Sequence, residues 1–525
     1  MTGLVARSIA LLALVSLLFP ITAASGGAAG SGRGHILGVV PHSAPRAAAI
    51  RAASPATLTF DASYETLINR YFTDVEHDSG GGSNVYSVAT QYSDGSGAVQ
   101  YQSTFGGAYV DHDPLPANGC NDGVDAYCLT DTQLAKEIQS VLTAKGWHGG
   151  LDHMFFLMTP AGVGSCFDAV HNDCTTNFFC AYHNFFVDSQ VEDVIYAYEP
   201  YEGASTPCTD SDQGFPNDPD SDTTINTISH EHNEAITDPL TDPNFLGWTA
   251  ADGNEVADLC VHGYGAQTGT GAAAYNQVIN GHHYDLQEEY SNADGGCVQH
   301  RGGTATPATV GSGPLVYQGG PVMHTNTTYA IYWLPTARNT SAPVVTGTAV
   351  VDRTLTTTAG SWAGATGARS YQWERCSSTG KSCADITGAT APSYKLTIVD
   401  AGHVVRSTVR AANVNGDSPP AASAGTAVVI DVPALRRPPL ISGRAQVGKK
   451  LSGSHGSWTY APRYTRRWLR CNARGGACSA VPGATRSSYR LTTRDVGHRL
   501  RLRLTATNAA GSRTAVSAPS ARIKG

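Results

Sequence analysis

The chain has 525 residues, a length typical of three or four folded units. Hydrophobic residues make up 41% of it, which excludes a wholly disordered chain because that share is enough to build cores. Charged residues are only 15%, and the net charge of −8 divides into +1 over residues 1–24, −29 over 25–335, +2 over 336–435 and +18 over 436–525. Few charges and many short apolar runs favour β-rich extracellular architecture. The charge split predicts parts with different partners.

The first 24 residues are typical of a secretory signal peptide. Arg7 precedes an apolar run over residues 8–19, and small residues follow at 22–24. That run is too short for a comfortable membrane span. We therefore expect a secreted protein, extracellular or cell-wall associated, with no membrane span once the signal is removed. Residues 25–60 have no hydrophobic period and are interpreted as a flexible leader.

Residues 61–335 alternate helical and strand-like segments. In chain order they predict a short amphipathic helix from Ala62, strands over 84–92 and 98–110, a helix capped by Asp131 and ended by Gly146, and strands over 153–160 and 191–200. This alternation predicts a mixed α/β (α+β) domain.

The last third of the chain contains an internal repeat with a period of 95 residues. Matching pairs are Trp373 and Trp468, Cys376 and Cys471, Cys383 and Cys478, Asp400 and Asp495, and His403 and His498. Alternating short strands predict two all-β sandwiches, module 1 over 340–432 and module 2 over 436–525, that resemble the immunoglobulin-like modules of secreted actinobacterial proteins. The repeated histidines fit a structural role at a turn better than a metal site.

The segment 222–240 predicts a helix capped by Asp222 or Thr223 and ended by Asp238-Pro239. At about 100° per residue from His230, Glu234 lies at about 40°, Asp238 at about 80° and Glu231 at about 100°. The isoleucines fall on the opposite face, and His232 falls on the same apolar side, at about 200°. One face therefore carries a histidine and three carboxylates.

The letters HEHNE resemble the zinc-peptidase motif HExxH with its second histidine replaced by glutamate. Two ligands one turn apart reach one ion, so His230 and Glu234 are the expected zinc ligands and Glu231 is the expected general base. Asp258 or Glu255 is expected to complete the site, and Asp238 is a further candidate. The alternative is a solvated polar face without metal.

Twelve cysteines in an exported chain predict disulfides. Cys120 and Cys128 are expected to form one, and Cys260 and Cys297 another. The set Cys166, Cys174, Cys180 and Cys208 is expected to make two more in an undetermined order, and each module pair, Cys376 with Cys383 and Cys471 with Cys478, a local one. A zinc knot of Cys166, Cys174, Cys180 and His183 is the alternative.

Several patches resemble the EXORDIUM/phosphate-induced protein family and its secreted bacterial relatives. They are SHEHNEAITDPL, GWTAADGNEVADLCVHGYG, HYDLQEEYSNADGGC, the Cys-rich segment from Val163, and LVYQGGPVMHTNTTYAIYWLP at 315–335. Plant members are secreted wall-space proteins without an established reaction, and bacterial relatives are similar to metallopeptidases. The resemblance implies functional roles for His230, Glu231 and Glu234. The last patch follows the body that it usually precedes, and we expect it to pair back as a strand.

Two hypotheses follow from these observations. The first is a secreted zinc-dependent hydrolase, a peptidase with a peptide substrate, followed by modules for spacing or surface attachment. The alternative is a non-catalytic extracellular adhesion or wall-associated protein of the EXORDIUM type. In either case, the arginines that alternate over 499–503 predict that the basic module contacts an anionic cell-wall polymer, and the alternative is a basic solvated face without a partner. No nucleic-acid partner is expected, because no recognition motif accompanies the charge.

Overall fold

The computed structural model describes residues 39–41, 58–171, 173–188, 192–201, 208–209, 212–461 and 463–525. It is mostly β and divides into two compact units, Met1–Thr336 and Ala337–Gly525. The predicted signal peptide lies outside the described residues. Part of the expected flexible leader is a strand, β1 (Val39–Pro41), which pairs with the first unit's sheet, so the leader prediction is wrong there.

The first unit is organised around one six-stranded sheet. Its order is β1, β8 (Phe179–Asp188), β9 (Glu192–Pro200), β6 (His153–Thr159), β16 (Asn326–Trp333) and β4 (Ser103–Asp111). The pairs from β9 to β4 are parallel, and β8 pairs antiparallel with both neighbours. The segment 315–335 does pair back, because β16 lies between β6 and β4.

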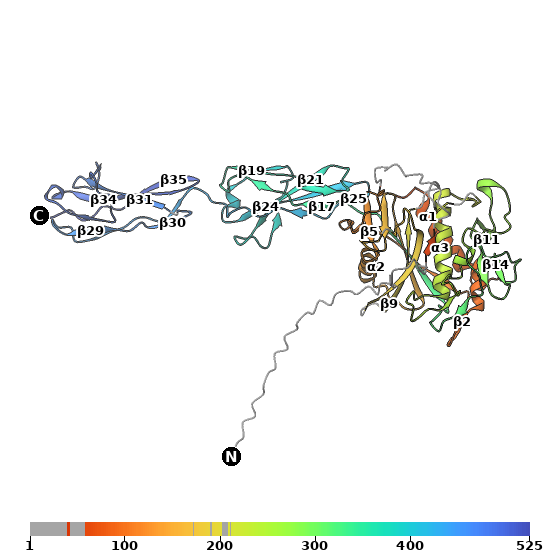
Figure 1. Cartoon of the computed structure of the whole chain (residues 1–525). Helices are drawn as coiled ribbons and strands as arrows, with labels where there is room; N and C mark the ends of the chain where they lie inside the picture. The colour runs from red at the N-terminus through yellow and green to blue at the C-terminus, as the bar shows by residue number, and fades with distance from the viewer. Residues whose placement is uncertain are drawn as a thin grey trace, which may run out of the picture. The chain divides into compact units, whose positions relative to one another are not determined.

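Helices cover both faces of this sheet (Figure 1). Helices α1 (Tyr64–His77) and α3 (Pro219–Thr237) pack on the face that Met154, Phe156 and Met158 present. Helix α2 (Asp131–Lys145) packs on the other face against Phe155 and Leu157. Alternate side chains of β6 therefore serve two cores, because successive residues of a strand point to opposite faces.

Short elements complete the first unit. They are the pairs β2 (Ser93–Asp94) with β3 (Gly97–Ala98), β5 (Tyr127–Thr130) with β7 (Val163–Cys166), β10 (Trp248–Thr249) with β15 (Val316–Tyr317), β11 (Gln277–Ile279) with β12 (His282–Tyr284) and β13 (Glu289–Ser291) with β14 (Gly296–Val298), and the 3₁₀ turns η1 (Val85–Gln91), η2 (Asp258–Cys260) and η3 (Gly271–Ala273).

Three local predictions are corrected by the structure. The strand predicted over 84–92 is the 3₁₀ turn η1, whose residues Val85–Ala89 are all buried, and a short apolar run does not distinguish the two. Thr130, not Asp131, caps α2 in a capping box with Gln133. Asp131 is instead buried and accepts a hydrogen bond from Tyr182. Helix α3 begins before 222, where Asp218 caps it by accepting from the Ser221 amide.

All twelve cysteines are paired. The bridges are Cys120–Cys128, Cys166–Cys174, Cys180–Cys208, Cys260–Cys297, Cys376–Cys383 and Cys471–Cys478. The expected disulfides are confirmed and the two open pairings are assigned. The alternative zinc knot is wrong, because its three sulfurs are committed to bridges. Such a set of disulfides is typical of proteins folded in an oxidising environment.

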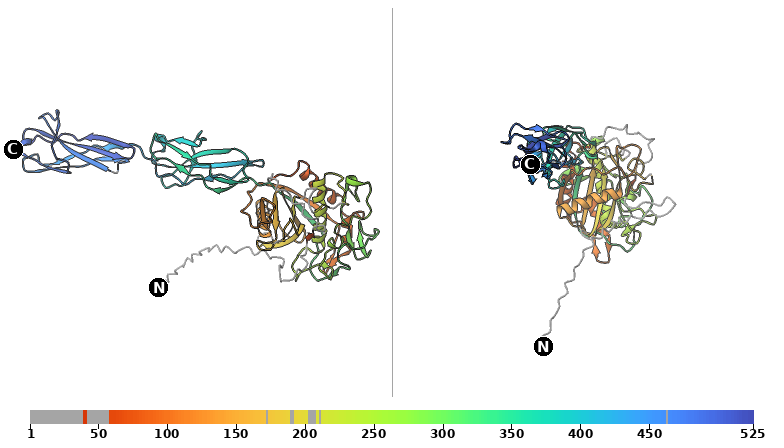
Figure 2. Two further views of the ribbon diagram at one scale, coloured as in Figure 1. Left: turned by 45° about the horizontal axis from the view of Figure 1, so that its top comes forward. Right: turned by 90° about the vertical axis from the view of Figure 1, so that its left-hand side faces the viewer.

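The second unit contains both copies of the repeat, each built from short antiparallel sheets around its own core (Figure 2). The first copy has β17 (Arg338–Ser341) with β20 (Ser361–Ala363); β18 (Val345–Thr346), β19 (Thr354–Thr357) and β23 (Ser393–Lys395); and β22 (Ala384–Asp385), β21 (Arg369–Cys376), β24 (Val404–Asn413), β25 (Gly416–Asp417) and β26 (Ala421–Ala422). The second has β27 (Ala434–Arg437) with β30 (Ser457–Thr459); β28 (Ile441–Gly443), β29 (Lys450–Gly453) and β33 (Ser488–Arg490); and β32 (Ser479–Ala480), β31 (Arg463–Cys471), β34 (Arg499–Asn508) and β35 (Gly511–Val516). These are immunoglobulin-like β-sandwiches, as predicted.

Matching residues of the two copies make matching contacts. Trp373 and Trp468 are both fully buried, and each indole donates to a carbonyl eighteen residues on. His403 donates its Nδ1 proton to the Cys376 carbonyl, and His498 does the same to Cys471. Since a carbonyl only accepts, these ring nitrogens carry hydrogen. The structural role expected for these two histidines is confirmed.

Asp495 is the single acid of the basic copy, and its replacement by asparagine is expected to destabilise that copy. Burial would raise its pKa, but hydrogen bonds from Thr492 and Arg470 hold the pKa below its usual value. A lowered folded pKa stabilises the fold above the unfolded pKa, near 4, and the contribution is lost as pH falls through the folded value. Asp495→Asn should cost about 3 kcal/mol at pH 7.

Urea unfolding of the full chain at pH 7 and pH 2.5 measures this effect. The difference between wild type and Asp495→Asn should shrink at the lower pH, whereas the exposed Asp417→Asn control should match wild type at both. An Asp495→Asn chain as stable as wild type at pH 7 would contradict the assignment.

Candidate metal centre

Helix α3 presents its predicted polar face to the protein interior. His230, Glu231, Glu234 and Asp238 are all 0% exposed, so the solvated-face alternative is wrong. The opposite face behaves as the sequence predicts: Ile225, Ile228 and Ile236 enter the core shared with α1.

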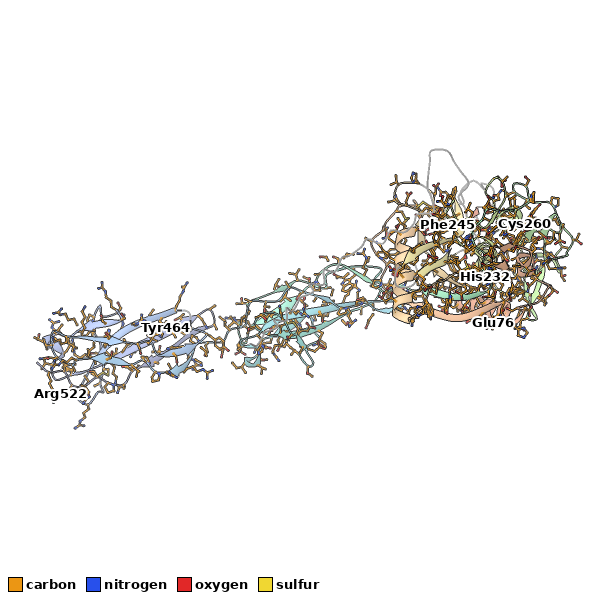
Figure 3. All side chains as sticks on the ribbon, turned by 90° about the horizontal axis from the view of Figure 1, so that it is seen from below. Glu76, His232, Phe245, Cys260, Tyr464 and Arg522 are labelled. Atoms are coloured by element: carbon orange, nitrogen blue, oxygen red, sulfur yellow. A yellow bond between two sulfur atoms is a disulfide. The ribbon has the colours of Figure 1, made fainter. Side chains whose placement is uncertain are left out.

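His232 lies on this apolar side, where it contacts Phe156, and Figure 3 shows it enclosed within the first unit. Its ring bonds Tyr86 and Asn326 at 3.1 and 3.0 Å. Burial lowers its pKa to about 4, so this histidine is neutral and structural.

Hydrogen bonds fix the orientation of the His230 ring. The Gln287 side chain donates through Nε2 to the Ala257 carbonyl at 3.0 Å, which leaves its Oε1 facing His230 Nδ1, also at 3.0 Å. Nδ1 therefore carries the hydrogen. The opposite nitrogen, Nε2, has no hydrogen-bond partner of good geometry and lies 2.9 Å from Glu234 Oε1 and 3.8 Å from Asp258 Oδ1. An imidazole held through one nitrogen with the other facing carboxylates is the arrangement of a metal ligand.

The two carboxylates beside His230 are also held by backbone groups. Glu234 Oε1 accepts from the Asp258 amide at 3.1 Å, and Asp258 Oδ2 accepts from the Glu255 amide at 3.0 Å. One ligand atom each from His230, Glu234 and Asp258 lie within 4.8 Å of one another. The sequence-predicted ligands of helix and loop are therefore brought together around one point, and the chemistry of the set fits zinc, which accepts mixed imidazole and carboxylate ligands.

His183 belongs to the same cluster, although the sequence did not identify it as part of a carboxylate site. Its Nε2 donates to the Asp238 carbonyl at 3.1 Å, and its Nδ1 lies 3.0 Å from Glu231 Oε2 and 3.6 Å from Glu234 Oε2. With acceptors on both nitrogens, the ring is an imidazolium, and the facing carboxylates raise its pKa well above the usual value although burial opposes this. The sequence offered one signal for this role, a histidine within the mostly apolar segment that forms β8.

The cluster contains more carboxylates than its two imidazoles balance. Burial and the neighbouring charge of Glu234 raise the pKa values of Glu255 and Asp258 well above their usual range. Glu234 is the exception: burial would raise its pKa, but His230 and His183 lower it to about 2. Burial alone would lower the pKa of His230, yet Glu234 raises it to about 10. Protons thus balance the charge in the metal-free chain, and metal binding would release them.

The remaining predicted residues lie at the edge of this centre. Asp238 is buried and its Oδ1 accepts from the Gly247 amide at 2.7 Å, outside the His230 group. Glu255 groups with His183 and Glu234 instead. Glu289 is fully buried nearby, both its carboxylate oxygens lack hydrogen-bond partners, and burial raises its pKa. The sequence reasoning missed Glu289, because it lies on a short strand, β13, without a recognisable motif.

Glu231, the predicted general base, is enclosed. One oxygen accepts from His183 and the other has no hydrogen-bond partner. A surface hollow lined by Gln213, Phe215, Tyr264 and neighbours includes no residue of the cluster. Hydrogen bonds connect the hollow to the cluster through Tyr264, whose hydroxyl accepts from the Asn226 side chain. Asn226 in turn accepts from the backbone amide of Gln287.

The second repeat copy carries an exposed basic face. Leu500, Leu502 and Leu504 of β34 point into the core, so Arg499, Arg501 and Arg503 point outward, as the alternation predicts. Arg499 and Arg501 donate to loop carbonyls of Ala473 and Gly475.

Arg503 lies opposite Arg467 of β31, and both are exposed. The equivalent pair in the first copy is the neutral Gln372 with Thr408. Like charges placed opposite each other destabilise a sheet. The second copy has such a pair and the first copy does not.

Comparison with known proteins gives no family. No family model matches the chain, and no curated protein matches it. Solved structures that share strands with it include the chicken CNTN1 FN1-FN3 domains (13% identity, TM-score 0.21, 36% of this chain and 65% of that one) and a Ca²⁺-stabilised adhesin of an Antarctic bacterium (10%, 0.22, 41% and 55%). An I-band fragment of titin is similar at 14% identity, with a TM-score of 0.19 over 38% of this chain and 68% of that one.

The chain thus spans less than two thirds of the first two of these structures. At such identities and TM-scores, these likenesses carry no argument about function. Among the described residues, every helix is too short or too polar to cross a membrane.

Proposed function

We propose that the chain is a non-catalytic extracellular protein of the wall-associated or adhesion kind, whose first unit is an α+β domain built around a buried zinc ion. The observation that supports this most strongly is the His230 ring, held through Nδ1 by Gln287 and facing Glu234 and Asp258 with Nε2. Zinc in such a site would tie α3 to the loop of Asp258. The resemblance of this helix and loop to EXORDIUM-type proteins supports the same class.

Complete burial favours a structural over a catalytic ion. A catalytic zinc keeps one position open to water or substrate, whereas a structural zinc is closed by protein ligands. His230, Glu231 and Glu234 are each 0% exposed. The two carboxylates Glu234 and Asp258 would balance the charge of the zinc ion without a substrate.

Thermal unfolding of the full chain with and without chelator tests this function. Chelation should lower the midpoint of the first unit by several degrees while the second unit unfolds unchanged, and zinc should restore it. Proton release during zinc addition would report displacement of the protons held by the cluster. A first unit that unfolds at the same temperature under both conditions would contradict the proposal.

A zinc-dependent hydrolase is the second candidate, and a specific observation favours it. Glu231 follows His230 directly in the helix and keeps one unpartnered oxygen, as a general base beside a metal would need. A peptide-library digest distinguishes the two. Cleavage that chelator abolishes and that Glu231→Gln removes, with zinc still bound, would establish the hydrolase; an unchanged library supports the structural role.

We also propose that the basic second copy retains the protein on an anionic wall polymer. Its support is the outward pair Arg467 and Arg503, which no acid of the copy faces, since Asp495 is buried against Arg470. An anionic polymer would relieve the repulsion between the two guanidinium groups.

The double variant Arg467→Glu/Arg503→Glu is expected to lose most of the chain's binding to purified teichoic acid. Wild-type binding should weaken steeply as salt rises from about 50 to 300 mM, because such contacts are screened. Sedimentation with teichoic acid coupled to insoluble beads measures both effects. The first-copy variant Arg353→Glu is the matched control and should bind like wild type. Salt-independent binding, or equal binding by the double variant, would contradict the proposal.

A further inference from the structure

A second group of acids in the first unit lies apart from α3, where the sheet meets α2. Asp111 is the last residue of β4, Asp113 follows in the next loop, and Glu137 lies in the second turn of α2. One carboxylate oxygen of each lies within 4.8 Å of the other two. None of the three makes an ion pair with a described basic residue.

The backbone around these acids is held firmly. The Leu334 amide donates to the Asp111 carbonyl at 2.8 Å, and the Trp333 indole donates to the Asp113 carbonyl at 2.8 Å. The Asp113 amide donates to Asp111 Oδ1 at 3.1 Å, so that oxygen is occupied. Hydrogen bonds from the end of β16 thus fix the backbone of Asp111 and Asp113 without a ligand.

The other oxygen of Asp111 is a second observation, besides the grouping of the acids, that points to a bound ligand. Asp111 is only 4% exposed, and its Oδ2 has no hydrogen-bond partner. Glu137 Oε1 is likewise buried, and the group that faces it is the Asp111 carboxylate. Leaving such buried acceptors unsatisfied is costly, and two facing carboxylates repel each other unless a proton or a cation lies between them. A cation between them would remove both costs.

We propose that Asp111, Asp113 and Glu137 bind a calcium ion. The ligand set is all oxygen, which suits a hard cation and not zinc. Calcium is bound at about 2.3–2.6 Å, so its ligand oxygens lie up to about 5 Å apart, in agreement with the spacing of this group. Asp113 is exposed, which leaves room for the waters that complete a calcium shell. The ion would join α2 to the end of β4 and to the loop that follows it.

Calcium titration of the zinc-loaded full chain, followed by isothermal calorimetry to about 10 mM, tests the proposal. We expect one calcium site in wild type and in the exposed-acid control Asp152→Asn. Asp111→Asn and Glu137→Gln should bind at least about tenfold more weakly, with zinc content unchanged. Because zinc is measured separately, failure here leaves the α3 centre untouched.

Two results would overturn the inference. One is a wild-type chain that takes up no calcium in this range, or whose uptake neither variant weakens. The other is a Glu137→Gln chain with a higher unfolding midpoint at every calcium concentration while wild type gains nothing from calcium, which would show that Asp111 and Glu137 share a proton instead.

Discussion

His230→Ala is expected to lose the zinc ion and to lower the unfolding midpoint of the first unit to that of the chelated wild type. The substitution removes the Nε2 atom that faces Glu234 and Asp258, and it leaves carboxylates buried without their cation. Gln287→Ala should act through the same ring more weakly, with about 10–100-fold lower zinc affinity, because Gln287 only orients His230. Zinc competition with a coloured chelator measures both affinities.

The matched control is His148→Ala, an exposed histidine of the same unit outside the cluster. It should keep wild-type zinc affinity and stability. Should His230→Ala fail to fold, Gln287→Ala still tests the assignment through its graded affinity. Wild-type zinc affinity in Gln287→Ala, or equal losses in His148→Ala, would contradict the role given to the ring.

Removing the Cys260–Cys297 disulfide is expected to have the second largest effect. The bridge closes a 37-residue separation and anchors the turn η2, which carries Asp258. Replacing both cysteines by serine should cost about 3–4 kcal/mol through chain entropy and should also weaken zinc binding, because Asp258 loses its anchor. Denaturant unfolding with and without zinc measures both the loss of stability and the weaker zinc binding.

The Cys120–Cys128 pair provides the comparison. It spans only eight residues and lies away from α3, so its removal should cost about 2–3 kcal/mol without changing zinc affinity. The contrast between the two variants separates stability from metal binding. Equal zinc affinities in the two double-serine chains would contradict the anchoring role of Cys260.

The helical arc of the site was predictable because a helix has a fixed period. The positions of His230, Glu231, Glu234 and Asp238 follow from about 100° per residue, and the structure places all four on the buried polar side. Asp258 and Glu255 were identified because both lie in one acidic segment downstream of the helix. His183 and Glu289 were not, since they come from strands that meet α3 only through the tertiary fold.

The fold was predictable where local signals repeat or have a strong period. The 95-residue repeat located matching buried tryptophans and the two local disulfides. The sequence predicts a strand where the structure has the turn η1. Residues Val85–Ala89 are all buried, so they show no alternation of polar and apolar side chains that would distinguish the two. The place of β16 between β6 and β4 depends on pairing across more than 160 residues, which no local pattern encodes.

The structure shows where charged side chains lie close together in each unit. Two groups of acids in the first unit could hold a metal ion, one around α3 with histidines and one at Asp111 with oxygens alone. In the second copy, Arg470 pairs with Asp495, Arg499 and Arg501 donate to loop carbonyls, and Arg467 and Arg503 lie opposite each other. We propose zinc for the first group, calcium for the second, and an anionic partner for the basic face.

Zinc content of the purified, folded chain tests the central proposal most directly. The account predicts one zinc ion per wild-type chain after dialysis against metal-free buffer, and none in His230→Ala, with His148→Ala equal to wild type. A wild-type chain that is folded, has all its disulfides, contains no zinc and takes up none when it is added would contradict it.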